Sequence, residues 1–513
     1  MEYGILSVIP AVIAILLAIF TKNIVVSLAI AVFVGSTILC GWNPILGFVE
    51  VTHTHIFAAL AESSNVQALF MMTIISGFIA LLTRSGGAGA FTSLVTKKVN
   101  TRAKCETGMW LGGLFVWFTD TGNSLLVGPV FEALGEKLRV SREKFSYILD
   151  CTTSPICSMV PIIGFGVTTI SLIQTELDVA GITDVSGMDV FIQGIPFNFY
   201  AILTLFMAGL VSFTQWDYGP MLKAQNRAMA TGQTIREGGS PLRSENEGSA
   251  KPNKNGKVST MLIPLAVLLV VLFAYLFSKD FLHTRVAGSD IRTAIASGFL
   301  CATLVLIVLC VKDKIFTFTQ CIDLYTKGCS NAMFMCVVLV LAWSLSSVTS
   351  SLDTANYLIS ATSGFLAPSV LPLVMFIIGA IMSFATGTSW GTMGVLMPLG
   401  LPVAINMGAS LPLVAAAILG GALFGDHCSP ISDTTVLASI GASCDHVDHF
   451  ETQLPYAVTV AVVCGICFLI AGWITNYAIL AVALVMLTAA VFVLHKLSVK
   501  KQGQVKTPGD VQV

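Results

Sequence analysis

Two aspartates lie within an otherwise apolar segment, residues 411–441, on either side of a proline. On an ideal helix Asp426, Ser429 and Asp433 (i, i+3, i+7) share one face. Pro430 removes a backbone donor and frees carbonyl oxygens near the two carboxylates. Carboxylate, hydroxyl and carbonyl oxygens are the ligands that hard cations such as Na⁺ prefer. Because burial and a neighbouring carboxylate also favour protonation, the segment predicts a site that holds Na⁺ or H⁺, but not both.

Competition between Na⁺ and H⁺ for one pair of carboxylates is the simplest physical basis for exchange, because the charges must be neutralised before the site crosses a membrane. We therefore expect Asp426 and Asp433 to be the Na⁺ ligands and the proton-exchanging groups. Three nearby hydroxyls are expected to supply further oxygens: Ser429, Ser432 and Thr434. His427 is expected to line the cavity, where it could tune the response to pH or be held as a hydrogen-bonded interior histidine.

A second polar interruption, Asp120-Thr121-Gly122-Asn123-Ser124, lies within the apolar run 108–131. A third, Thr386-Gly387-Thr388-Ser389-Trp390-Gly391-Thr392, lies within the run 371–407. Acidic residues inside a membrane face a cavity by default, so Asp120 is expected to take part in ion binding. The interruptions predict the tips of two helical hairpins that enter and leave the membrane on one side.

Asp150 opens another set of polar residues that share one face of an ideal helix around Pro155: Asp150, Thr153, Ser154 and Cys157. Two interpretations of Asp150 remain open. It could belong to the ion site, or it could be solvated or cap a turn near the end of its span.

The predicted site has two groups of residues. Those expected to bind ions or exchange protons are Asp120, Asp150, Asp426, Ser429, Ser432, Asp433 and Thr434. Those expected to line the cavity are Thr121, Asn123, Ser124, Ser154, Thr386, Thr388, Ser389 and His427. A further group, Asp445, His446, Asp448 and His449, has the residue types of a metal tetrad, but its place after the last polar turn favours a solvated cytoplasmic loop.

The composition defines the environment of these residues. Of 513 residues, 55% are hydrophobic and 11% are charged, and the mean hydropathy is +0.85. A soluble chain would carry about a quarter charged residues, so we predict an all-α polytopic membrane protein embedded in lipid. The net charge of −1 gives no support for a nucleic-acid partner, and the 13 cysteines are scattered through apolar stretches, where the one CxxC spacing, Cys464–Cys467, lies inside a predicted span. No phosphate-binding GxxxxGK[ST] motif occurs, so no cofactor is expected and transport would use an ion gradient.

Apolar runs of nearly the length of a bilayer core predict about eleven transmembrane helices in addition to the two hairpins. These runs are 5–20, 24–40, 66–83, 147–174, 196–216, 259–278, 294–311, 331–350, 411–441, 455–474 and 476–495. The first lacks the basic start and cleavage pattern of a signal peptide, so it is expected to remain as a span. Helices 147–174 and 411–441 are expected to be broken at their prolines.

Basic residues set the expected orientation, because Lys and Arg concentrate on the cytoplasmic side. With both hairpins re-entrant, only Lys279, Arg285 and Arg292 of the 27 basic residues lie outside. The N-terminus is then external and the C-terminus cytoplasmic. No Lys or Arg falls within a predicted span, which mildly favours a cation as the transported species, although helix N-termini can also hold a carboxylate.

The same topology contains an inverted repeat of three spans, a hairpin and two spans. The first copy is 1–216 and the second is 259–475; a flexible cytoplasmic linker, 217–258, joins them, and 476–513 adds a span and a tail. Ser154-Pro155-Ile156 in the first copy matches Ser429-Pro430-Ile431 in the second. Inverted repeats with broken helices that meet near the midplane are typical of secondary transporters.

At these motifs the chain resembles the NhaC family of Na⁺/H⁺ antiporters, within a wider superfamily of inverted-repeat ion carriers. The resemblance rests on 386–392 with Met397-Pro398, on 425–434 and on 120–124. It implies Na⁺ extrusion driven by inward H⁺ movement, alternating access, an inner-membrane location and a scaffold that often dimerises. Relatives of the family also exchange organic acids such as malate and lactate, or move amino acids. A Na⁺- or H⁺-coupled carrier of such a solute therefore remains the alternative, and a channel or membrane-embedded enzyme is a third possibility.

Overall fold

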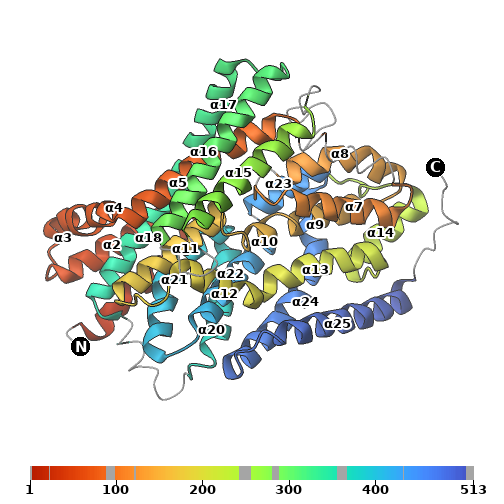
Figure 1. The fold of residues 1–513 in the computed structure, drawn as a ribbon. Helices are drawn as coiled ribbons and strands as arrows, with labels where there is room; N and C mark the ends of the chain where they lie inside the picture. Colours follow the sequence, from red (N-terminus) through yellow and green to blue (C-terminus); the bar gives the residue numbers. More distant parts are fainter. Residues whose placement is uncertain are drawn as a thin grey trace.

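The computed structural model describes residues 3–21, 23–87, 90, 99–120, 123–241, 256–279, 288–354, 357, 367–430 and 432–503. Within these ranges the regular elements are helices, and one isolated β-bridge pairs Pro241 with Asp445. Nine stretches of the described chain are long and apolar enough to cross a membrane. Figure 1 shows the helices gathered into one bundle. The prediction of an all-helical polytopic membrane protein is thus confirmed at this level.

The helices of the first part of the chain run from the N-terminus to a short helix after the fifth predicted span. They are η1 (Gly4–Val8), α1 (Ile9–Thr21), α2 (Ile24–Leu39), α3 (Pro44–Glu50), the π-helical η2 (Val51–Ile56), α4 (Phe57–Ala61), α5 (Ser63–Arg84), α7 (Arg102–Phe115), α8 (Asn123–Lys137), α9 (Arg142–Cys151), α10 (Ser154–Cys157), α11 (Gly164–Val179), α12 (Gly187–Gly194), η3 (Ile195–Phe197), α13 (Phe199–Thr214) and α14 (Gly219–Thr231).

The second part of the chain contributes the remaining helices. They are α15 (Ser259–Ser278), α16 (Gly288–Lys312), α17 (Phe318–Asn331), α18 (Met333–Ser351), α20 (Leu371–Thr386), α21 (Ser389–Met407), α22 (Leu411–His427), α23 (Asp433–Ala442), α24 (His446–Trp473) and α25 (Ile479–Gln502).

One apolar helical stretch, Pro44–Ala61, is absent from the predicted spans. It comprises α3, η2 and α4, and most of its surface is exposed, including Ile45 and Phe48. The polar run Val51-Thr52-His53-Thr54-His55 lowers its hydropathy, which explains why the sequence prediction omitted it. His55 is nevertheless buried, and its Nδ1 lies 2.9 Å from the Ser347 hydroxyl of α18.

Both broken helices are interrupted more completely than the sequence predicted. Helix α22 ends at His427 and α23 begins at Asp433, so Asp426, Ser429 and Asp433 do not lie on one continuous helix face. The expectation of a shared face is therefore wrong, because the segment around Pro430 leaves the helical path before the next helix starts.

The first broken helix has the same kind of interruption. Three short pieces, α9, α10 and α11, replace the predicted span 147–174. Asp150 lies in the last turn of α9, and Ser154 begins α10, so these residues do not share one helix face either. Each break leaves backbone carbonyl and amide groups that need partners inside the bundle.

Paired helices flank the two polar interruptions that predict the hairpin tips. Helices α7 and α8 flank the first, and α20 and α21 flank the second. The second tip turns at Gly387, whose φ of 69° lies in the left-handed region that favours glycine. Thr388 then caps α21 by accepting a hydrogen bond from the Gly391 backbone amide. The helices extend beyond the predicted range 108–131 in the first hairpin, from Arg102 to Lys137.

Helix α9 begins earlier than predicted, and its first turn is buried. Arg142, Glu143 and Lys144, which precede the predicted span 147–174, are all buried. The Lys144 ammonium lies 2.8 Å from carboxylates of both Glu106 and Asp217. Lys144 lies just before the predicted span 147–174, and acidic partners on α7 and before α14 neutralise its charge.

The linker 217–258 is structured in its described part. Residues 219–231 form helix α14, which packs on α9, α24 and α25. After it, the Arg236 guanidinium pairs with Asp448 at 2.8 Å, and the Ser240 amide donates to the Asp445 carboxylate. Partial burial opposes ionisation of Asp445, but backbone donors and Arg236 outweigh it and hold the pKa of this carboxyl below its usual value. The prediction of a flexible loop therefore fails for residues 217–241.

Replacing the buried ammonium should destabilise the fold strongly. Lys144→Met leaves the buried Asp217 without its ion pair and leaves Glu106 with Arg102 alone, at 3.7 Å, which we expect to cost about 3–5 kcal/mol. The thermal unfolding midpoint of the detergent-solubilised protein would measure the loss. Lys223→Met, at an exposed position on α14, is the matched control and should leave the midpoint unchanged. Equal midpoints for the two variants would contradict the structural role of Lys144.

Candidate functional site

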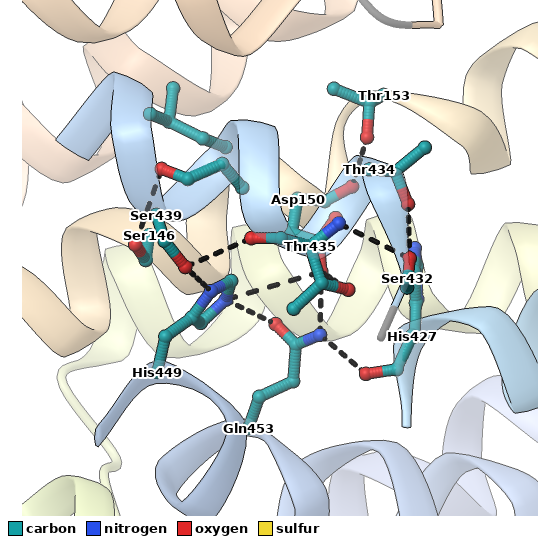
Figure 2. A network of polar contacts seen from close by, with 12 residues as sticks. Ser146, Asp150, Thr153, His427, Ser432, Thr434, Thr435, Ser439, His449 and Gln453 are labelled. Atoms are coloured by element: carbon teal, nitrogen blue, oxygen red, sulfur yellow. Dashed lines mark hydrogen bonds and ion pairs between the residues drawn. The ribbon is translucent and has the colours of Figure 1, made fainter. Parts of the chain in front are cut away.

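Asp150 lies at the centre of a buried network formed by four helices (Figure 2). Its carboxylate oxygen Oδ2 accepts hydrogen bonds from Gln453 Nε2 at 2.6 Å and Thr435 Oγ1 at 3.1 Å. His449 Nε2 lies 3.9 Å from the same oxygen. The other oxygen, Oδ1, has no hydrogen-bond partner among the described residues. A buried carboxylate oxygen without a donor is costly, so it is available to a cation or a proton.

Asp426 joins the same network through the first residues of α23. The Ser432 hydroxyl donates to Asp426 Oδ1 at 2.7 Å and lies 3.0 Å from the Thr434 hydroxyl. Ser432 also caps α23, because its side chain accepts from the Thr435 amide. Thr435 in turn donates to Asp150. The N-terminus of α23 thus supplies hydroxyls to two carboxylates that lie far apart in the sequence.

Gln453 holds the broken end of α22 beside Asp150. Its amide nitrogen donates to the His427 carbonyl oxygen at 2.8 Å as well as to Asp150. These two acceptors orient the amide, so its oxygen faces His449 Nε2 at 2.9 Å. The His427 ring lies 3.3 Å from the Tyr200 hydroxyl through Nδ1, while Nε2 has no partner in the described part of the chain.

His449 and His446 were expected to belong to a solvated loop, and this prediction is wrong for His449. Helix α24 begins at His446, nine residues before the predicted span 455–474, and carries His449 into the core, where it is fully buried. The Ser439 hydroxyl lies within hydrogen-bond distance of Nδ1 of both histidines. His446 is partly exposed and also contacts the Pro430 carbonyl through Nε2. The partners of His446 are thus hydrogen-bonding groups of this chain. The described residues contain no cluster of His, Cys, Asp and Glu suited to a metal.

At the first hairpin tip, Asn123 satisfies backbone carbonyls that two helix ends leave free. Its side-chain nitrogen donates to Gly113 and Thr152 at 2.8 Å each and to Val116 at 3.3 Å. Its side-chain oxygen and the neighbouring Ser124 hydroxyl are buried and lack partners among the described residues. Asn123 therefore ties the tip of the hairpin to the break after α9.

Asp120 connects the two hairpin tips. Its Oδ2 accepts a hydrogen bond of 3.0 Å from the indole nitrogen of Trp390. The Trp390 ring packs on Phe165 at the start of α11, with ring centroids 4.8 Å apart. Asp120 is thus near the tips, while Asp150 and Asp426 form the hydroxyl-linked cluster.

The other predicted residues occupy defined places. Thr386 donates to the backbone of its own helix α20, and Thr388 caps α21. Ser154, Ser389 and Ser429 are buried at the starts of α10 and α21 and in the break after α22. Thr121 lies outside the described residues, and so does the side chain of Asp433, whose backbone begins α23.

Three residues of the cluster were absent from the predicted set: Thr435, His449 and Gln453. His449 and Gln453 are four residues apart, directly before the predicted span 455–474. This spacing places both side chains on one helix face, which could have indicated that they act together. Thr435 follows the predicted Thr434 and faces Asp150 instead of Asp426.

Close helix contacts at glycines position α23. A Cβ on Gly128 of α8 would lie 2.2 Å from the Gly441 carbonyl oxygen of α23, and a Cβ on Gly441 would lie 2.4 Å from the Ser124 carbonyl oxygen. Only glycine permits this backbone approach. The hairpin helix α8 and the hydroxyl-bearing helix α23 are therefore in direct backbone contact.

Membrane-length helices, two hairpins and a buried oxygen cluster beside broken helices define a multi-pass membrane transporter. Sequence comparison identifies its family. The profile described as the Na⁺/H⁺ antiporter family matches residues 156–473, and the chain belongs to this family.

Individual relatives agree with this assignment. An uncharacterised protein of Haemophilus influenzae is 30% identical, with 94% of this chain and 95% of the relative aligned. The malate-2H⁺/Na⁺-lactate antiporter of Bacillus subtilis is 38% identical over 28% of this chain and 31% of its own length. Among solved structures, the YdaH transporter of Alcanivorax borkumensis matches with a TM-score of 0.56 and 12% identity, over 82% of this chain and 88% of that chain. The last match supports the fold alone.

Filling the contact between α8 and α23 should disturb the cluster. Gly128→Ala forces the helices apart or strains them, and overpacking of this kind costs about 1–3 kcal/mol. We expect a lower thermal unfolding midpoint in detergent. Gly465→Ala on α24 is the control, since the nearest atom to its added methyl group lies 3.5 Å away. The close contact would be refuted if both alanine variants unfolded at the wild-type temperature.

Proposed function

We propose that this protein exchanges Na⁺ for H⁺ at the buried cluster of Asp150 and Asp426. The observation that carries the proposal is the bridge at the start of α23, where Ser432 donates to Asp426 and Thr435 donates to Asp150. Carboxylates, hydroxyls and freed carbonyls together form an oxygen ligand set for an alkali ion. Na⁺ is here a transported substrate.

Protonation and Na⁺ binding would exclude one another at this cluster. Asp150 has one oxygen held by donors and one without a partner, so a single proton or cation at the free oxygen would neutralise it. Ser429, Thr434 and Asp433 are proposed to complete the Na⁺ coordination, as expected from their sequence positions. Because an unneutralised buried carboxylate is expensive, the site would cross the membrane only when one of the two cations occupies it.

We further propose that the chain is an inverted repeat, 1–216 and 259–475, that works by alternating access. The order of elements supports it, since each half contains a hairpin followed by a broken helix. The packing supports it too: α8 of the first hairpin contacts α23, and α21 of the second contacts α11. Each hairpin would thus move with the broken helix of the other half.

The proposed setting is the plasma membrane, the inner membrane where the cell has two, with the N-terminus outside and the C-terminus in the cytoplasm. The positions of the basic residues support this orientation. We propose a homodimer on the basis of the family resemblance, with lipid covering the remaining apolar surface.

A second candidate is coupled transport of a small organic acid or amino acid. The printed name of the Bacillus subtilis relative, a malate-2H⁺/Na⁺-lactate antiporter, favours it. The N-termini of α21 and α23 could hold a carboxylate, since helix N-termini carry partial positive charge. In this case the Asp150–Asp426 cluster would hold the coupling ion.

Removing the charge of either aspartate should abolish exchange without unfolding the protein. Asp150→Asn and Asp426→Asn keep the side-chain volume, but they remove the charged carboxylate that binds either Na⁺ or H⁺. We expect at least a tenfold loss of Na⁺-dependent proton movement in proteoliposomes. Asp323→Asn, at an exposed position of α17, should retain the wild-type rate. Normal exchange by either cluster variant would show that its aspartate is structural.

A pH dye inside the proteoliposomes separates the two candidate functions. Internal alkalinisation when Na⁺ enters, with no organic solute present, is the result expected for a Na⁺/H⁺ antiporter. If proton movement begins only when malate, lactate or an amino acid is added, the coupled carrier is correct instead. In that carrier, Na⁺ affinity would also depend on the organic substrate by reciprocal linkage.

A further inference from the structure

A polar pocket of about 240 Å³ lies between α11, α18 and α21, away from the Asp150–Asp426 cluster. Two carboxylates, Glu176 and Asp353, take part in its lining. The hydroxyls and amide that line it are Ser346, Ser350, Thr349, Thr354 and Asn406. No lysine, arginine or histidine is among the described residues around it. The charge of the pocket therefore suits a cation.

Glu176 is the more deeply buried of the two carboxylates in the pocket lining. It belongs to α11 and is 2% exposed, although it carries a carboxyl group inside an apolar bundle. The Ser346 side chain of α18 lies beside it. Burial of a carboxyl group without a basic partner is unfavourable, so the position calls for a ligand that can neutralise it.

Ser346 supplies an independent sign of a ligand. Its residue is 1% exposed, and its hydroxyl forms no hydrogen bond of standard geometry among the described residues. Buried hydroxyls almost always have partners. Since Ser346 lines the same pocket as Glu176 and its side chain interacts with that carboxyl group, both side chains are available to one occupant of the pocket.

The pocket is lined by α11, α18 and α21, whereas the residues of the Asp150–Asp426 cluster belong to α9, α22, α23 and α24 and to the break before α23. In Figure 1, α11, α18 and α21 lie toward the N-terminus at the left, whereas α8, α9 and α23 lie further right. Glu176 is 12 residues beyond Gly164, about 18 Å along a helix. Gly164 is next to Trp390, which binds Asp120 between the two tips.

We propose that this pocket is a second Na⁺ site, in which Glu176, Ser346 and neighbouring oxygens hold the ion before or after it visits the Asp150–Asp426 cluster. The assignment rests on the proposed Na⁺ transport function. The pocket concentrates Na⁺ at one face of the protein, and its lining shares no residue with the inner cluster. In the predicted orientation this face is external.

Equilibrium binding of ²²Na⁺ to the purified protein tests the site separately from transport. In an Asp150→Asn/Asp426→Asn background, exchange is expected to stop while one Na⁺ per chain still binds. Adding Glu176→Gln should weaken that remaining binding at least tenfold. Adding Asp178→Asn instead, which removes an exposed charge on the same helix, should leave it unchanged. Glu176→Asp keeps the charge and should retain most of the binding.

Several outcomes would overturn the proposal. Binding that is unaffected by Glu176→Gln would exclude the pocket as a Na⁺ site, and so would an absence of binding in the doubly substituted background. Displacement of ²²Na⁺ by methylammonium at concentrations where unlabelled Na⁺ is ineffective would assign the pocket to an organic cation instead. Failure of the wild type to exchange Na⁺ for H⁺ in liposomes, with Glu176-dependent binding intact, would refute the proposed function but not the site.

Discussion

Burial of carboxylates in an apolar bundle is the constraint on which the rest of this structure depends. Asp150 and Asp426 lie where water is excluded, so other parts of the chain must supply their hydrogen bonds. The donors come from Ser432 and Thr435 at the start of α23 and from Gln453 on α24. Helix breaks, glycine contacts and the early start of α24 all serve to bring these donors to the same place.

Sequence reasoning located the breaks and tips because proline, glycine and short polar residues have strong local effects. It also identified Asp150, Asp426, Ser432 and Thr434, which the structure brings into one network. It failed where local rules assumed a continuous helix, since α22 stops at His427. It also missed His449 and Gln453, because their contacts with Asp150 arise from tertiary packing of residues about 300 positions apart.

Charged residues show the same difference between what local sequence indicates and what tertiary packing produces. Lys144 belongs to a charged stretch before a predicted span, and packing places it between Glu106 and Asp217 with no exposed surface. Hydropathy cannot reveal such a pairing, since each partner looks solvated in isolation. The Lys144 ammonium and its two carboxylate partners hold α9, the helix that carries Asp150, against α7 and the segment before α14.

The hydrogen bond between Trp390 and Asp120 has a spectroscopic consequence. An indole that donates to a carboxylate and stacks near Phe165 has a different excited-state environment from one in contact with water. Of the seven tryptophans in the chain, Trp390 is the one that bridges the two hairpin tips. In a variant that keeps Trp390 and replaces the other six tryptophans, the emission would therefore report on this contact between the tips without any attached label.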